Sequence, residues 1–180
     1  PAAPEAAAPE APAAPELAPC PVPEAPLVAP VPDVPALDVP ALLRALEMLT
    51  ERHPMLRTTF SAPHGEPIQR IHNQVELSFR HEDVSDNPEG FLCRRLTEEA
   101  HRPFDIENGP TMRVVLFTQS EQDHTLILVI HHIVADFWSL SVLMKEMSLL
   151  YSASRDGSPA SLPSLRLQYS DYVRWQDAVL

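Results

Sequence analysis

Two adjacent histidines and an aspartate lie together at the end of an apolar segment. His131 and His132 follow the apolar run at residues 126–130, and Asp136 comes four residues after the second histidine. A free imidazole has a pKa of about 6.5, so it can take up or release a proton at neutral pH. Loops at the ends of strands are common places for such chemistry. We therefore take this segment as the candidate site.

The elements on either side decide where these side chains point. Residues 126–130 form a short, β-branched, uninterrupted run, which predicts a buried strand, paired with a second predicted strand at Met112–Thr118. From Leu140 onward the apolar residues recur at helical spacing. Consecutive side chains on a strand point to opposite faces, so if the strand continues to His132, only one of His131 and His132 can face a given side.

The rest of the chain mixes short strands with amphipathic helices. Asp38 is predicted to cap a helix that runs to about Arg52, and Pro103 ends a later helix. Tyr172 and Trp175 are expected to be packing residues on a final helix. Further strands are predicted at residues 56–60, 67–71 and 75–79, the last two as a hairpin, and further helices at residues 91–101 and 169–179. This mixture predicts an α/β (α+β layered) fold.

The first 36 residues differ in kind from the remainder. Thirteen of the 21 prolines fall within residues 1–40, and no lysine or arginine precedes Arg44. Proline fixes φ and removes backbone donors, so we predict a disordered, extended inter-domain linker at residues 1–36 and one folded domain at residues 37–180. Such a spacer predicts another folded domain upstream. A ligand tract for a proline-reading domain is the weaker interpretation, because aromatic and basic flanks are missing.

Composition excludes several classes of function. The formal net charge is −12, which argues against a nucleic-acid partner. No apolar run approaches the roughly 20 residues that a membrane span needs. A basic segment followed by an apolar stretch, as in a signal peptide, is also missing. We therefore expect a cytoplasmic protein with no membrane contact.

Three segments carry a resemblance to a known family. Residues 52–60 read RHPMLRTTF, residues 131–136 read HHIVAD and residues 169–176 read YSDYVRWQ. Together they resemble the condensation domains of nonribosomal peptide synthetases, whose patterns are approximately RHxxLRTxF, HHxxxDG and YxDYxxWQ. The stretch PFDIENGPTMRVVLF is also similar to that family. HHxxxD alone is a weak signal, whereas three ordered motifs are strong. The resemblance covers about residues 37–180.

The resemblance implies a chloramphenicol-acetyltransferase-like fold of two related subdomains with a tunnel between them. This chain would supply the N-terminal subdomain only, the C-terminal subdomain being absent. The implied reaction forms a peptide bond between a donor acyl or peptidyl thioester and an acceptor aminoacyl thioester. Both substrates would be carried on phosphopantetheine arms of carrier proteins, with no cofactor or metal bound directly. The expected partners are upstream and downstream carrier proteins and adjacent synthetase domains.

The resemblance also implies roles for individual residues. His132 would be catalytic and Asp136 mainly structural, while His131 is expected to pack inside as support. From its position Asp136 can cap the following helix. Arg57 is one candidate cationic partner for Asp136, and an arginine outside this chain is equally compatible. Phe137 occupies the position where the family has glycine. The resemblance places this position next to the tunnel, so the benzyl group either narrows the path of the acceptor substrate or marks a specialised subgroup.

The chemistry needs a proton acceptor. An α-amino group has a pKa of about 8, so the acceptor is mostly protonated, and the tetrahedral adduct must lose a proton. His132 can take that proton, orient the amine or stabilise the charged adduct. The donor thioester is already activated, which favours direct transfer without a covalent enzyme intermediate. We expect the isolated chain to be inactive.

Three alternatives remain open at this point. An inactive, truncated interaction fragment is favoured by Phe137 and by the missing subdomain. An O- or N-acyltransferase of the same fold, using a coenzyme A or carrier thioester, also fits HxxxD. A metal site built from His131, His132 and Asp136 is disfavoured, because zinc needs three or four ligands converging at about 2 Å and neighbouring strand residues diverge.

Overall fold

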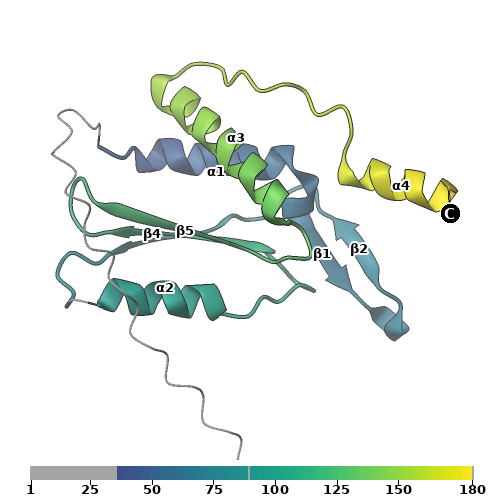
Figure 1. Ribbon diagram of the computed structural model, residues 1–180, viewed down its shortest axis with the longest axis horizontal. Coiled ribbons are helices and arrows are strands. Elements are labelled where there is room, and N and C mark those ends of the chain that lie inside the picture. The colour runs from purple at the N-terminus through teal and green to yellow at the C-terminus, as the bar shows by residue number, and fades with distance from the viewer. Residues whose placement is uncertain (1–35, 89, 180) are drawn as a thin grey trace, which may run out of the picture.

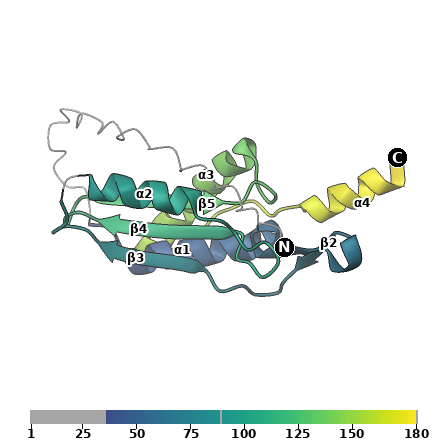
Figure 2. The same cartoon turned by 90° about the horizontal axis from the view of Figure 1, so that it is seen from below.

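The computed structural model describes residues 36–88 and 90–179. Apart from residue 36, the predicted linker lies outside the described residues. The described chain forms three layers, with helices α1 and α3 on one face of a sheet and helix α2 on the other (Figures 1 and 2). The layer elements are α1 (Val39–Arg52), β3 (Ser78–Asp83), α2 (Phe91–His101), β4 (Met112–Thr118), β5 (His124–Ile130) and α3 (Phe137–Asp156).

Helix α1 begins and ends as its sequence predicts. The carboxylate of Asp38 accepts a hydrogen bond from the Ala41 N–H at 2.8 Å, which satisfies one of the free donors of the first turn. Its apolar face is buried against α3 and the sheet. The members of that face are Leu42, Ala45, Leu46 and Leu49. Burial of this stripe, rather than helix propensity alone, stabilises a helix of this length.

The three-stranded sheet has the order β3-β4-β5, parallel between β3 and β4 and antiparallel between β4 and β5. Met112, Val114 and Leu116 of the central strand face α1 and α3, whereas Val115 and Phe117 face α2. Strand β5 was predicted to be buried, but all seven of its residues are half-buried, because it is an edge strand of the described sheet. Its apolar composition therefore reflects packing on both faces rather than full enclosure.

The predicted hairpin of residues 67–71 and 75–79 is wrong. Strand β2 (Ile68–Ile71) pairs instead with β1 (Thr58–Ser61), with Thr58 opposite Ile71. Strand β3 belongs to the other sheet and pairs in parallel with β4, the α2 segment forming the crossover between them. The predicted start of β1 is also wrong, because Pro54–Arg57 forms a 3₁₀ turn.

Helix α4 (Tyr169–Val179) lies at the end of an extended segment, away from the three layers (Figure 1). Its aromatic residues are exposed: Tyr172 by 50% and Trp175 by 59%. Their rings contact each other at 5.8 Å between centroids. The prediction that they pack against the body is therefore wrong within the described chain. None of the described helices is both long enough and apolar enough to span a membrane.

Candidate active site

The two histidines begin a short turn between β5 and α3. The N–H of His131 donates to the Thr111 carbonyl at 2.9 Å, which extends the β4–β5 pairing by one residue. The Val134 N–H then donates to the His131 carbonyl at 3.1 Å and closes a turn. Helix α3 starts three residues later, at Phe137. The imidazoles therefore lie where the sheet ends, as the sequence predicts.

His131 packs on the side of the sheet that α2 covers. Its ring lies perpendicular to that of Phe104, with 5.6 Å between the centroids. The Ile133 N–H donates to Nδ1 of His131 at 3.1 Å, so Nδ1 is an acceptor and the ring proton is on Nε2. The side chain has the local hydrogen bond predicted for it but is half-buried rather than fully enclosed, and its supporting role stays a prediction.

His132 points to the other side and is exposed. Its Nδ1 lies 2.9 Å from the carbonyl oxygen of Ala135. A carbonyl only accepts, so this contact requires a proton on Nδ1, and in the neutral ring the lone pair is then on Nε2. An imidazole held in this tautomer is arranged to accept a proton through Nε2.

A cavity of about 410 Å³ lies beside His132, within the range of small-molecule sites. Its walls come from the end of α1 with the 3₁₀ turn, from the histidine turn, from the first turns of α3 and from residues 165–169. His53, Leu56 and Trp138 are among its lining residues, as is Tyr169 at the start of α4. The cavity is lined mostly by apolar side chains, with His132, Asp136 and Gln168 among its polar ones.

Asp136 caps α3 as predicted. Its carboxylate accepts hydrogen bonds from the Ser139 N–H at 2.7 Å and from the Ser139 hydroxyl at 2.6 Å. The hydroxyl and the backbone N–H of Ser139 lower the pKa of this carboxyl, so it is ionised at neutral pH. The side chain is exposed rather than buried, so it needs no buried cationic partner.

Arg57 does not pair with Asp136, and that predicted contact is wrong for the described part of the chain. Its guanidinium donates to backbone carbonyls instead: Thr50 at 3.0 Å, Asn73 at 3.1 Å, and also that of His72. These bonds tie the end of α1 to the segment after β2. Arg57 therefore fixes the end of α1, next to the cavity-lining residues 53–56, and does not hold the start of α3.

Phe137 is 84% exposed and does not line the cavity, whereas its neighbour Trp138 is 78% exposed and does. Within the described chain, the benzyl group at the family's glycine position therefore lies outside the cavity. The predicted narrowing of an acceptor path stays untested. No group of three or more histidine, cysteine, aspartate or glutamate side chains among the described residues is placed to hold a metal ion.

One ionic cluster in the wall escaped the sequence reasoning. Glu146 of α3 is 8% exposed and accepts two hydrogen bonds from Arg52, at 2.9 and 3.2 Å. The Nε2 of His53, which lines the cavity, lies 2.6 Å from the same carboxylate. A signal was present, because Glu146 interrupts the apolar face between Leu143 and Met147. A charge at such a position needs a partner.

Comparison with known proteins gives one consistent result. A family model described as the condensation domain matches residues 33–180. Over 145 residues the chain is 45% identical to a chondramide synthase of Chondromyces crocatus, covering 78% of this chain and 4% of that protein. It is 42% identical to a linear gramicidin synthase of Brevibacillus parabrevis, covering 78% of this chain and 2% of the relative.

Solved structures share the fold. The X-domain from teicoplanin biosynthesis superposes with a TM-score of 0.73 at 33% identity, covering 80% of this chain and 31% of that one. The first condensation domain of the calcium-dependent antibiotic synthetase gives a TM-score of 0.68 at 25% identity, covering 80% of this chain and 35% of that one. The predicted chloramphenicol-acetyltransferase-like fold is confirmed by these neighbours. The chain spans about a third of their length and a few per cent of the curated relatives.

Proposed function

The chain belongs to the condensation-domain family of nonribosomal peptide synthetases, and on that basis we propose that residues 37–180 are the N-terminal subdomain of a peptide-bond-forming domain. Residues 1–36 would be the linker from a preceding domain. The substrates would be a donor acyl or peptidyl thioester and an acceptor aminoacyl thioester, each on the phosphopantetheine arm of a carrier protein. The membership and the position of His132 beside the cavity support this proposal.

His132 is the proposed catalytic residue. The acceptor nitrogen attacks the donor carbonyl carbon and forms a tetrahedral adduct, which collapses by breaking the carbon–sulfur bond. The nitrogen must lose one proton, and Nε2 of His132 is the group in position to accept it. That proton is then delivered to the departing thiolate, so the thiol leaves neutral and the imidazole is regenerated. General base catalysis of this kind contributes about 10²–10⁴-fold.

Direct transfer is favoured over a covalent enzyme intermediate by the groups present at the cavity. Of the described residues that line it, none is cysteine and the one serine is Ser139. Its hydroxyl already donates to Asp136 at 2.6 Å. The carboxylate that accepts this bond has a lowered pKa and is therefore a weak base, so it does little to activate Ser139 as a nucleophile. His131, Asp136 and Arg57 are proposed as structural support for the turn and for the cavity wall.

The test uses the full-length protein and carrier-bound substrates, with the product detected by mass spectrometry. We expect His132→Ala to abolish condensation and His131→Ala mainly to lower stability. A matched control is His81→Ala, which removes an exposed histidine on β3. Unchanged turnover in His132→Ala would remove this residue from the mechanism.

A second candidate is a protein-binding module without condensation activity. The chain is 34% identical to the X-domain in a solved complex of the X-domain and OxyB from teicoplanin biosynthesis. The exposed rings of Phe137 and Trp138 are compatible with a protein partner. The same assay separates the two candidates, because this one requires that the wild-type protein form no peptide bond.

A further inference from the structure

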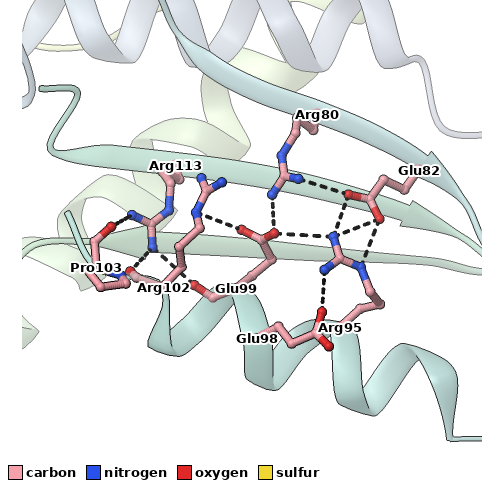
Figure 3. A network of polar contacts seen from close by, with 8 residues as sticks. All are labelled: Arg80, Glu82, Arg95, Glu98, Glu99, Arg102, Pro103 and Arg113. Atoms are coloured by element: carbon pink, nitrogen blue, oxygen red, sulfur yellow. Dashed lines mark hydrogen bonds and ion pairs between the residues drawn. The ribbon is translucent and has the colours of Figure 1, made fainter. Parts of the chain in front are cut away.

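A dense group of charges lies on the face of the sheet opposite the cavity, between the sheet and α2 (Figure 3). Its centre is Glu99, which is 3% exposed. The carboxylate accepts from Arg80 and, at 3.3 Å, from Arg95, and Arg102 lies 3.6 Å from its second oxygen. Glu82 and Glu98 complete the set by binding Arg95. Three arginines thus surround the buried carboxylate of Glu99.

Arg113 of β4 lies beside this group but is bound differently. It is 5% exposed, and no carboxylate among the described residues lies within ion-pair distance of its guanidinium. Instead it donates to the carbonyls of Glu99 at 3.2 Å, Arg102 at 2.6 Å and Pro103 at 3.1 Å (Figure 3). These carbonyls belong to the end of α2, where the helix dipole favours a cation.

Burying this cation is costly. Desolvation, with the repulsion of Arg102 next, lowers the pKa of Arg113, and its buried Nε has no hydrogen-bond partner among the described residues. Val115 and Phe117, the next residues on the same face of β4, are apolar, as this layer requires. Packing alone therefore does not explain an arginine at this position. Its contact with the Phe104 ring offers an explanation.

Phe104 joins Arg113 to the histidine turn. The guanidinium carbon lies over the Phe104 ring, 3.8 Å from its centroid. The same ring also contacts the His131 imidazole, at an interplanar angle of 90° and with centroids 5.6 Å apart. Fixed by three carbonyl bonds, the guanidinium forms a rigid plane that holds Phe104, and Phe104 in turn limits the directions His131 can take.

His131 controls the turn that carries His132. Its Nδ1 accepts from the Ile133 N–H, and its carbonyl accepts from the Val134 N–H, so both ring and backbone hold the next three residues. Rotation of the His131 ring breaks the first of these bonds and frees the backbone at His132. The orientation of the proposed catalytic imidazole therefore depends on a contact made on the opposite side of the sheet.

We propose that Arg113 and Phe104 are positioning residues for the candidate site, acting through His131 on the direction of His132. The activity readout of this inference rests on the proposed function, whereas the effect on the orientation of His131 can be measured without it. A small misplacement of a reacting group lowers the rate of the chemical step more than it affects binding. We therefore expect loss of the Phe104 ring to lower kcat about tenfold with little change in KM.

The principal variant is Phe104→Leu in the full-length protein. Two readouts are measured: kcat and KM for condensation, and the tautomer of His131 from the ¹⁵N signals of labelled histidine. The wild type should show an unprotonated Nδ1 at His131, and the variant a mixture of tautomers. Phe104→Tyr keeps the ring and should restore both. Phe117→Leu is the matched control, since it removes a buried ring from the same layer without touching His131.

The outcomes separate the two proposals. Loss of kcat and of the fixed tautomer in Phe104→Leu, with both retained in Phe117→Leu, supports the positioning role. Retention of both in Phe104→Leu overturns it, whatever happens in His132→Ala. If wild-type protein forms no peptide bond, the proposed function fails and the tautomer alone decides the inference. If Phe104→Leu does not fold, the same two readouts are measured on Arg113→Lys, because an ammonium has no planar group to lie over the Phe104 ring.

Discussion

The ionic cluster between α1 and α3 offers the sharpest test of how the cavity wall is held. Glu146 binds Arg52 through two hydrogen bonds, and the side chains are only 10% and 18% exposed. Arg52 also donates to the Pro163 carbonyl at 2.6 Å, which ties in the segment leading to α4. Removing one member of such a pair leaves the other charge buried without its partner.

The expected magnitudes follow from that geometry. Arg52→Met leaves Glu146 with His53 alone, so we expect the free energy of unfolding to fall by about 3 kcal/mol. Glu146→Leu leaves Arg52 with one carbonyl and some access to solvent, so a loss of about 2 kcal/mol is expected. The double variant leaves neither Arg52 nor Glu146 as an unpaired charge, so its free energy of unfolding should fall by less than that of Arg52→Met alone. The loss in the double variant is then smaller than the sum of the two single losses by at least about 2 kcal/mol, which is the coupling energy of the pair.

The assay is urea unfolding of wild type, both single variants and the double variant, with a shared slope as the check that only stability has changed. Arg174→Met is the control, because the Arg174–Asp171 pair on α4 is 79% and 40% exposed and should contribute within about 0.5 kcal/mol. If the double variant loses the sum of the two single losses, the side chains do not interact across α1 and α3, and the reasoning is refuted.

Three further predictions concern the same wall and the start of α3. Burial by itself raises the pKa of Glu146, but hydrogen bonds from Arg52 and His53 outweigh it and hold the folded-state pKa below 4.5. The stabilisation from this ionised carboxylate is therefore present above about pH 4.5 and is lost as the pH falls through the folded-state pKa. Glu146→Gln should remove this acid-sensitive component of stability, measured as urea midpoints over a series of pH values. Asp136→Ala should lower the urea midpoint by loss of the helix cap, and Asp136→Asn should retain most of it because asparagine is an equally good cap; equal losses in both would argue against capping. Phe137→Ala should change the free energy of unfolding by no more than about 0.5 kcal/mol, since the ring is 84% exposed, and a larger loss in the full-length protein would mean that the ring is covered there.

The sequence by itself determined those features that depend on neighbouring residues. The Asp38 and Asp136 caps and the α2 boundaries were all readable, because each signal lies within a turn or two of the chain. The divergence of His131 and His132 was predicted from strand alternation; the structure places the two rings on opposite sides, although β5 ends at Ile130 and the histidines begin the turn after it.

Only the tertiary structure decided which distant segments meet. Strand β2 pairs with β1 rather than with β3, since composition does not distinguish one apolar edge from another. Glu146 lies 94 residues from Arg52, and Phe104 lies between Arg113 and His131 without any periodic pattern that links them. Buried polar groups must be hydrogen-bonded or paired, because leaving them unpaired costs free energy. The sequence shows that such a residue interrupts an apolar face, but it does not show which distant residue is its partner.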